Sequence, residues 1–226
     1  MFMIGCCKAR WQGWIGALLL AALTGCRTVP FDETPRVSTR AWDAETVRAE
    51  FADRLPPRFE WRHAMTFEFP FFKMSALGIA AGDRVAQTFT LVCFTHTGVT
   101  LFEMQGDGES VQARFTIPEM AARPEMGEAI AEDARRMFFN LAPSANARVR
   151  RRRQKLVFVE EAASGRVEYD FGGDDRVLLE KRYRRGWRKR ATVRYFEYGE
   201  DDGFLRPRGI VLRNHERKYQ LVFRAL

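Results

Sequence analysis

The sequence is poor in the residues that build metal sites, disulfides and nucleophilic active sites. It contains four cysteines and three histidines in 226 residues. His63, His96 and His215 show no spacing to a cysteine or carboxylate that is typical of a zinc site. No serine lies in a Gly-x-Ser-x-Gly motif, and no Gly-x-x-x-x-Gly-Lys loop is present. Two acidic pairs beside glycine, Asp174-Asp175 and Asp201-Asp202, suit calcium, but hairpin turns explain them more simply. We therefore expect no metal and no cofactor.

A long hydrophobic run is also missing. The apolar segment Trp14 to Leu23 covers 10 residues, about half of the roughly 20 that a membrane-spanning helix needs. Lys8 and Arg10 precede it, and Leu23-Thr24-Gly25-Cys26 closes it with the residue types of a lipobox. This order predicts a signal peptide over residues 1–25. Its resemblance to bacterial lipoprotein signals implies cleavage before Cys26 and lipidation of Cys26. In the alternative, the protein is secreted and Cys26 is incidental.

The residue after Cys26 predicts the location. An aspartate there favours retention in the inner membrane of proteobacteria, whereas this chain has Arg27. We therefore expect a lipid anchor in the periplasmic leaflet of the outer membrane. Once residues 1–25 are removed and Cys26 is acylated, Cys93 is the one thiol left, so no intrachain disulfide can form. Cys93 lies in the apolar run 89–94, which favours a buried, unreactive thiol.

The charge balance points to an anionic partner. The formal net charge is +8. A chain tethered outside the cytoplasm rarely meets nucleic acid, so anionic lipid headgroups are the expected counterpart. Arginine-rich codon usage is the alternative explanation. The densest basic run, Arg148 to Lys155, either faces a bilayer or forms a solvated loop.

Composition divides the chain into a tether and one domain. Residues 26–41 contain Pro30, Pro35 and several threonines without apolar periodicity, which predicts a flexible tether. Residues 42–226 are long enough for a single domain. Asp43 suits a helix N-cap, and Val47, Phe51 and Leu55 follow at helical spacing. A second helix is predicted over 127–141 by the same period.

Alternation of apolar and polar residues predicts strands in most of the remaining sequence. The first covers 59–69, with His63 assigned to its polar face. Further strands are predicted over 74–80, 86–95, 99–105 and 111–117, and, after the second helix, over 156–159, 167–171, 177–183, 191–198, 209–213 and 219–223. Short Gly- and Asp-containing turns favour antiparallel pairing.

The strand faces supply candidate binding residues. Many strands and few helices leave a curved sheet partly uncovered, so its apolar face either lines a lipid cavity or forms an ordinary core. The candidate cavity residues are Phe59, Trp61, Met65, Phe67, Phe89, Leu91, Phe102 and Met104. Phe71 and Phe72 follow the first strand and are candidates for membrane contact, the alternative being a packed strand bend.

The whole pattern resembles the LolA/LolB-like superfamily. It is most similar to a family of small bacterial outer-membrane lipoproteins of unassigned function, through Thr97 to Met104 followed by Gly106-Asp107-Gly108. The ending Leu205 to Leu212, followed by Tyr219 to Phe223, looks like the closing hairpin of the superfamily. The resemblance implies a mainly β (α+β) fold, an antiparallel unclosed half-barrel with helices over its open side. It also implies a cavity for acyl chains and no enzyme activity. LolB-like receptors insert an exposed leucine into the membrane, and Phe71 or Phe72 would serve in its place.

We therefore expect a monomeric outer-membrane lipoprotein that binds a lipid, glycolipid or lipoprotein cargo and aids its delivery to the membrane. The second hypothesis is a structural or assembly lipoprotein with a solid core that binds a protein partner. A third, a lipid hydrolase, requires a serine or an aspartate pair to converge in a pocket.

Overall fold

The computed structural model describes residues 29–162 and 165–226. The predicted signal peptide and Cys26 lie outside these ranges. Residues Phe31–Leu226 form one structural unit. Its helices are α2 (Ala44–Asp53), α3 (Pro118–Ala121) and α4 (Pro124–Phe138), and its strands are β1 (Arg58–Glu68), β2 (Lys73–Asp83), β3 (Thr88–Phe94), β4 (Thr100–Gly106), β5 (Val111–Thr116), β6 (Arg148–Arg152), β7 (Lys155–Ala162), β8 (Gly165–Gly172), β9 (Val177–Arg185), β10 (Arg188–Asp201), β11 (Phe204–Asn214) and β12 (Tyr219–Ala225).

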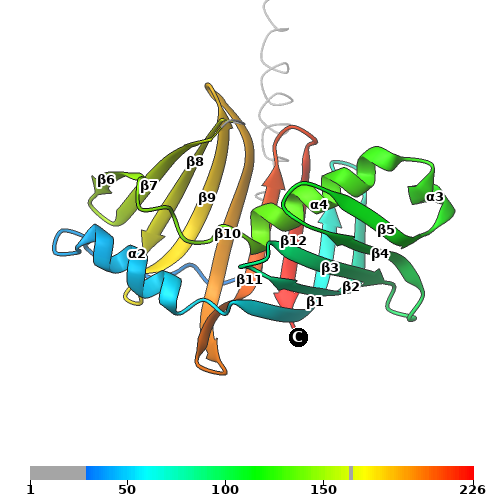
Figure 1. Ribbon diagram of the computed structural model, residues 1–226, viewed down its shortest axis with the longest axis horizontal. Coiled ribbons are helices and arrows are strands. Elements are labelled where there is room, and N and C mark those ends of the chain that lie inside the picture. Colours follow the sequence, from blue (N-terminus) through cyan, green and yellow to red (C-terminus); the bar gives the residue numbers. More distant parts are fainter. Residues whose placement is uncertain (1–28, 163–164) are drawn as a thin grey trace, which may run out of the picture. The chain divides into compact units, whose positions relative to one another are not determined.

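All of these strands belong to one antiparallel sheet (Figure 1). The strand order is β5-β4-β3-β2-β1-β12-β11-β10-β9-β8-β7-β6, so β5 and β6 are the two edges and the sheet is not closed. Every pair except β1 with β12 joins neighbours along the chain, because short turns connect them. The β1–β12 pair brings Met65 opposite Phe223 and joins the two halves of the sheet. The predicted unclosed half-barrel is confirmed.

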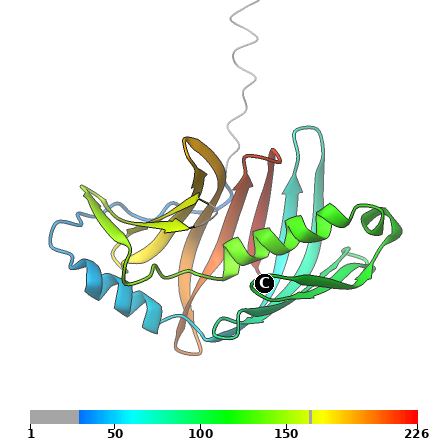
Figure 2. The ribbon, with the colours of Figure 1, turned by 45° about the horizontal axis from the view of Figure 1, so that its top comes forward.

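Two helices cover the concave inner face of the sheet (Figure 2). Helix α2 begins at the N-cap Asp43, whose carboxylate accepts a hydrogen bond from the Thr46 amide at 2.8 Å, and it buries Val47 and Phe51. Helix α4 crosses the other half of the face and buries Ala131, Ala134, Met137 and Phe138. The ring of Phe51 meets that of Phe171 on β8 at 5.1 Å, which anchors α2 on the sheet.

Helix α4 ends three residues earlier than the predicted Leu141. Phe139 is extended, with φ −117° and ψ 164°, and Asn140 has φ +49°. The ammonium group of buried Lys181 on β9 donates to the carbonyls of Phe139 at 2.8 Å and Asn140 at 3.2 Å. These bonds satisfy the carbonyl groups of the two residues that follow the helix. The carbonyl of Phe138, the last helical residue, accepts a hydrogen bond from Arg84 Nε at 3.1 Å.

Three local expectations differ from the structure. His63 is not on the polar face of β1: it is 3% exposed and points inward with Trp61 and Met65, because the odd positions all share that face. The basic run is not a loop. Its first five residues form edge strand β6, which is fully exposed and paired with β7.

The predicted tether also packs in part. From Phe31 onward it lies on the outer face of the sheet, where the ring of Phe31 stacks on Phe196 at 5.3 Å. A Cβ atom on Gly209 would come within 2.5 Å of the Phe31 ring, so glycine makes room for this contact. Further along, Thr39 is buried and its amide donates to the Arg153 carbonyl at 3.2 Å.

Candidate functional site

An apolar groove lies between helix α4 and the inner face of β1, β2, β3, β4 and β12. Its volume is about 620 Å³. Its apolar lining comprises Met65, Phe67, Phe69, Phe72, Met74, Ile79, Leu91, Val92, Leu101, Phe102, Ile117, Met120, Met126, Ala129, Ile130, Ala134, Met137, Phe138, Leu221 and Phe223. Its polar lining comprises His63, Cys93, Arg123, Glu125, Asp133, Arg217 and Tyr219. The groove therefore suits a mainly hydrocarbon ligand.

Small residues on β2 shape the floor beneath this groove. The inward positions of β2 are Ala76, Gly78, Ala80 and Gly82, opposite Met65, His63, Trp61 and Phe59 on β1. A Cβ atom on Gly78 would lie 2.5 Å from Met65 Cε and 2.7 Å from His63 Nε2. Because Gly78 has no side chain, these two β1 side chains lie across β2. Small residues at every second position of β2 were the sequence signal for this feature. The prediction missed it because it chose large apolar residues as the candidates for the cavity.

Four of the eight predicted cavity residues line the groove, namely Met65, Phe67, Leu91 and Phe102. The other four, Phe59, Trp61, Phe89 and Met104, are buried in the core beyond it. Three of these pack against the end of α4: the rings of Phe59 and Trp61 meet Phe138 at 5.7 and 5.2 Å, and Phe89 meets Phe139 at 6.0 Å. The wall formed by α4 was missing from the prediction, although its helical period marked an apolar face.

One end of the groove is open and aromatic. Phe69 and Phe72 line it and are 40% and 57% exposed, while Phe71 between them is fully exposed. The ring of Phe69 meets those of Phe72 at 6.1 Å and Tyr219 at 5.6 Å. An apolar surface therefore runs from the solvent-exposed β1–β2 turn into the groove. A packed strand bend does not account for Phe71.

The polar groups of the lining are few and specifically placed. His63 Nδ1 lies 3.2 Å from the Trp61 carbonyl oxygen, while its Nε2 has no hydrogen-bond partner among the described residues. Burial lowers the pKa of His63 to about 4, so its ring is neutral at pH 7. Asp133 on α4 accepts hydrogen bonds from the Tyr219 hydroxyl and from Arg136 at 3.0 Å. Burial raises the pKa of Asp133, and these hydrogen bonds oppose the shift.

Cys93 also contributes to the lining but is not a nucleophile candidate. It is buried, and within the part of the chain that the structure describes it is a free thiol. Burial raises the pKa of its thiol to about 12, so the reactive thiolate is scarce at neutral pH. The expectation of a buried thiol is confirmed.

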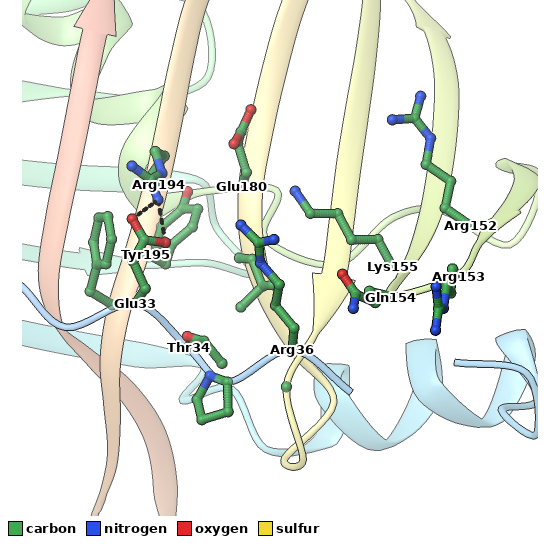
Figure 3. Close-up of a pocket in the computed structure, with 14 residues that line it drawn as sticks. Glu33, Thr34, Arg36, Arg152, Arg153, Gln154, Lys155, Glu180, Arg194 and Tyr195 are labelled. Carbon is green, nitrogen blue, oxygen red and sulfur yellow. Dashed lines mark hydrogen bonds and ion pairs between the residues drawn. The ribbon is translucent and has the colours of Figure 1, made fainter. Parts of the chain in front are cut away.

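A second pocket, on the outer face, has a different character (Figure 3). It has a volume of about 680 Å³ and lies between residues 33–36 and the β6–β7 turn. Arg194 donates to both carboxylate oxygens of Glu33 at 2.7 Å, and Lys155 pairs with buried Asp170 at 3.0 Å. Since charged side chains dominate it, this pocket does not suit an acyl chain.

The described residues contain no cluster of three or more His, Cys, Asp or Glu side chains that could hold a metal ion. Within the same ranges, no helix has the length and apolar character needed to cross a bilayer.

Comparison with solved structures identifies the fold. A LolA superfamily protein from Nitrosomonas europaea superposes with a TM-score of 0.52 at 10% identity, covering 82% of this chain and 92% of the other. A domain described as an outer membrane lipoprotein-sorting protein, from Vibrio parahaemolyticus, gives 0.50 at 12% identity, covering 81% and 91%. At such identities the likeness establishes the LolA-like fold alone.

Sequence comparison identifies the family. No curated protein matches the chain. A family described as a protein of unknown function, DUF3261, matches residues 60–226. This range runs from the first strand to the C-terminus and includes every residue that lines the groove. The chain therefore belongs to the DUF3261 family, whose fold is here that of the LolA superfamily.

Proposed function

We propose that this protein binds the acyl chains of a lipid or lipoprotein cargo in the groove under α4 and aids delivery of that cargo to a membrane. The observation that carries the proposal is an apolar groove of about 620 Å³ whose open end is formed by exposed Phe69 and Phe72. Pockets that bind small ligands typically measure about 300–1,000 Å³ and are mostly apolar.

Transfer needs no chemical step. Burying each methylene of an acyl chain contributes about 0.8 kcal/mol, and a chain gains similar stabilisation in the groove or in a bilayer. The net free energy of exchange is therefore small, and cargo moves toward whichever site buries it better. Phe71 and Phe72 contact the membrane and give the acyl chain of the cargo an apolar route past Phe69 into the groove. We propose that the protein has no enzyme activity.

The cellular setting belongs to the same proposal. Lipidated Cys26 anchors a monomer in the periplasmic leaflet of the outer membrane, where lipids, glycolipids and lipoproteins are available and nucleic acid is not. The lipobox and Arg27 support this setting. The LolA-like fold is compatible with it.

The alternative is an assembly lipoprotein with a solid core and no ligand. The groove argues against it, since side chains of the domain itself do not fill the space beneath α4. The third hypothesis, a lipid hydrolase, has little support, because the groove lining contains no serine and a single aspartate, Asp133.

Binding of a fluorescent fatty acid tests the proposal. Phe67→Asp places a charge in the groove and should lower affinity at least tenfold, because acyl burial would leave the carboxylate poorly solvated. Phe115→Asp is the matched control: Phe115 lies on β5 outside the groove and is 47% exposed. Equal affinity in wild type, Phe67→Asp and Phe115→Asp would contradict groove binding. So would an absence of saturable binding in the wild type.

A further inference from the structure

Three neighbouring hairpin turns form one edge of the domain. They join β1 to β2 (residues 69–72), β9 to β10 (residues 186–187) and β11 to β12 (residues 215–218). The strand order β2-β1-β12-β11-β10-β9 and antiparallel pairing bring them to the same side, with Glu68 opposite Gln220 and Ala191 opposite Asn214. Figure 2 shows the three turns side by side at the top. We name them the turn edge.

Large aromatic side chains project from this edge without a role in the core. Trp187 at the tip of the β9–β10 hairpin is 98% exposed, and Phe71 on the β1–β2 turn is 102% exposed. Gly186 has φ +57°, the conformation that two-residue hairpin turns require and that glycine adopts readily. A tryptophan at such a tip loses favourable burial unless something covers it. The interface between lipid headgroups and acyl chains is an environment that tryptophan prefers.

The same edge is strongly basic. Residues 184–190 contain five basic side chains and no acidic one, and the β11–β12 turn adds Arg217 and Lys218 against Glu216. Glu216 is already paired with Arg190 at 2.9 Å. In the described ranges, Arg185, Arg188 and Lys189 form no ion pair. These cations are therefore available to an external anion.

The opposite edge has the reverse character over much of its length. The β8–β9 turn carries Asp174 and Asp175, and the β10–β11 turn carries Asp201 and Asp202 beside Glu200. The β6–β7 turn, with Arg153, and the β2–β3 turn, with Arg84, are basic exceptions. Charge and exposed aromatic side chains therefore coincide at the turn edge, which distinguishes it from a uniformly solvated surface.

We propose that the turn edge docks on the surface of a bilayer containing anionic lipids, with Trp187 and Phe71 inserted as two separate contacts. Basic side chains near an anionic membrane each contribute about 1 kcal/mol, close to a fivefold change in an equilibrium. Phe69, Phe72 and Arg217 belong both to the turn edge and to the lining of the groove, so docking turns the open end of the groove toward the bilayer. Docking itself requires no cargo.

Tryptophan quenching in vesicles tests this inference on the full chain. The protein is reconstituted into phosphatidylcholine vesicles with or without one quarter phosphatidylglycerol, made with normal or brominated acyl chains. The chain has five tryptophans, so the signal of Trp187 is the difference between wild type and Trp187→Ser. We expect this signal to be quenched by brominated lipid and shifted to shorter wavelength, more strongly in the anionic vesicles.

Two controls test whether the position of the tryptophan and the position of the basic residues matter. In Trp187→Ser/Val85→Trp, the tryptophan moves to the β2–β3 turn on the opposite edge, where Val85 is 83% exposed, and it should stay unquenched. Arg185→Glu/Arg188→Glu should lower the docked-to-undocked ratio more than about tenfold, whereas Arg152→Glu/Arg153→Glu should leave it unchanged. Both pairs are exposed, so circular dichroism should report the wild-type fold.

Equal quenching of tryptophan at positions 187 and 85, or no quenching of Trp187 in anionic vesicles, would overturn the inference. Capture of acidic proteins in place of anionic vesicles would do the same. The outcome is separable from the proposed function. Loss of docking with intact fatty-acid binding overturns docking alone, and the converse result overturns groove binding alone.

Discussion

At the scale of single residues, the groove depends on a few positions that differ from their neighbours in polarity or size. His63 is a polar side chain in an apolar floor, where its ring meets that of Phe223 at 4.8 Å. Gly78 leaves the space that His63 and Met65 occupy. The alternation of β1 already places residue 63 inward, so strict period-two counting finds its position. That His63 Nε2 has no hydrogen-bond partner among the described residues depends on strands far away in sequence and was not predictable.

The buried imidazole predicts a pH dependence of stability. The pKa of His63 is about 4 in the folded protein, against an ordinary value of 6.5 for a solvated histidine. The unfolded chain therefore binds more protons between these values, and stability falls as pH decreases from 6.5 to 4. The contribution of His63 to the free energy of unfolding falls by about 3 kcal/mol over this pH range.

Urea unfolding of wild type and His63→Leu at several pH values measures this contribution. The difference in the free energy of unfolding between the two proteins should change by about this amount across the window, since other titrating groups cancel. A constant difference from pH 6.5 to pH 4 would show that the imidazole is not buried.

At the scale of elements, regular periodicity was predictive and irregular segments were not. The alternation of β1 and the helical period of α4 gave the correct element types, with α4 displaced by three residues at each end. Strand β6 was not predicted, because Arg148 to Arg152 contains one apolar residue and so shows no alternation. Its pairing with β7 stabilises the strand. The segment after Phe31 read as a tether because its contacts, Phe196 and Arg194, are distant in the sequence.

The small-residue face of β2 makes a testable contribution to the groove. Gly78→Val adds atoms where even a Cβ would lie 2.5 Å from Met65 Cε, so we expect a loss of about 1–3 kcal/mol in stability from overpacking and weaker fatty-acid binding. Gly127→Ala in α4 is the control, because its Cβ would meet Met104 Cε at an ordinary 3.8 Å. It should stabilise the helix by up to about 1 kcal/mol. Thermal unfolding distinguishes the two, and a neutral Gly78→Val would argue that β1 side chains move freely.

At the scale of the whole molecule, local sequence patterns could not predict the strand order or the groove. The β1–β12 pairing joins segments about 155 residues apart and creates the continuous sheet that α4 covers. Resemblance to the LolA/LolB-like superfamily supplied this architecture, and the solved structures bear it out. Of the eight residues predicted to line a cavity, four line the groove, because which part of an apolar face stays open depends on where α4 lies.

The central claim is that acyl chains occupy the space beneath α4. A fatty acid carrying a photoactivatable diazirine near its methyl end tests it most directly, with cross-linked peptides identified by mass spectrometry. The account predicts saturable cross-links to α4 residues such as Met126 and Ile130 and to Phe67 or Leu91 on the sheet, all of them groove-lining, and competition by unlabelled fatty acid. Cross-links confined to exposed surfaces such as Phe115, or insensitive to competitor, would contradict it.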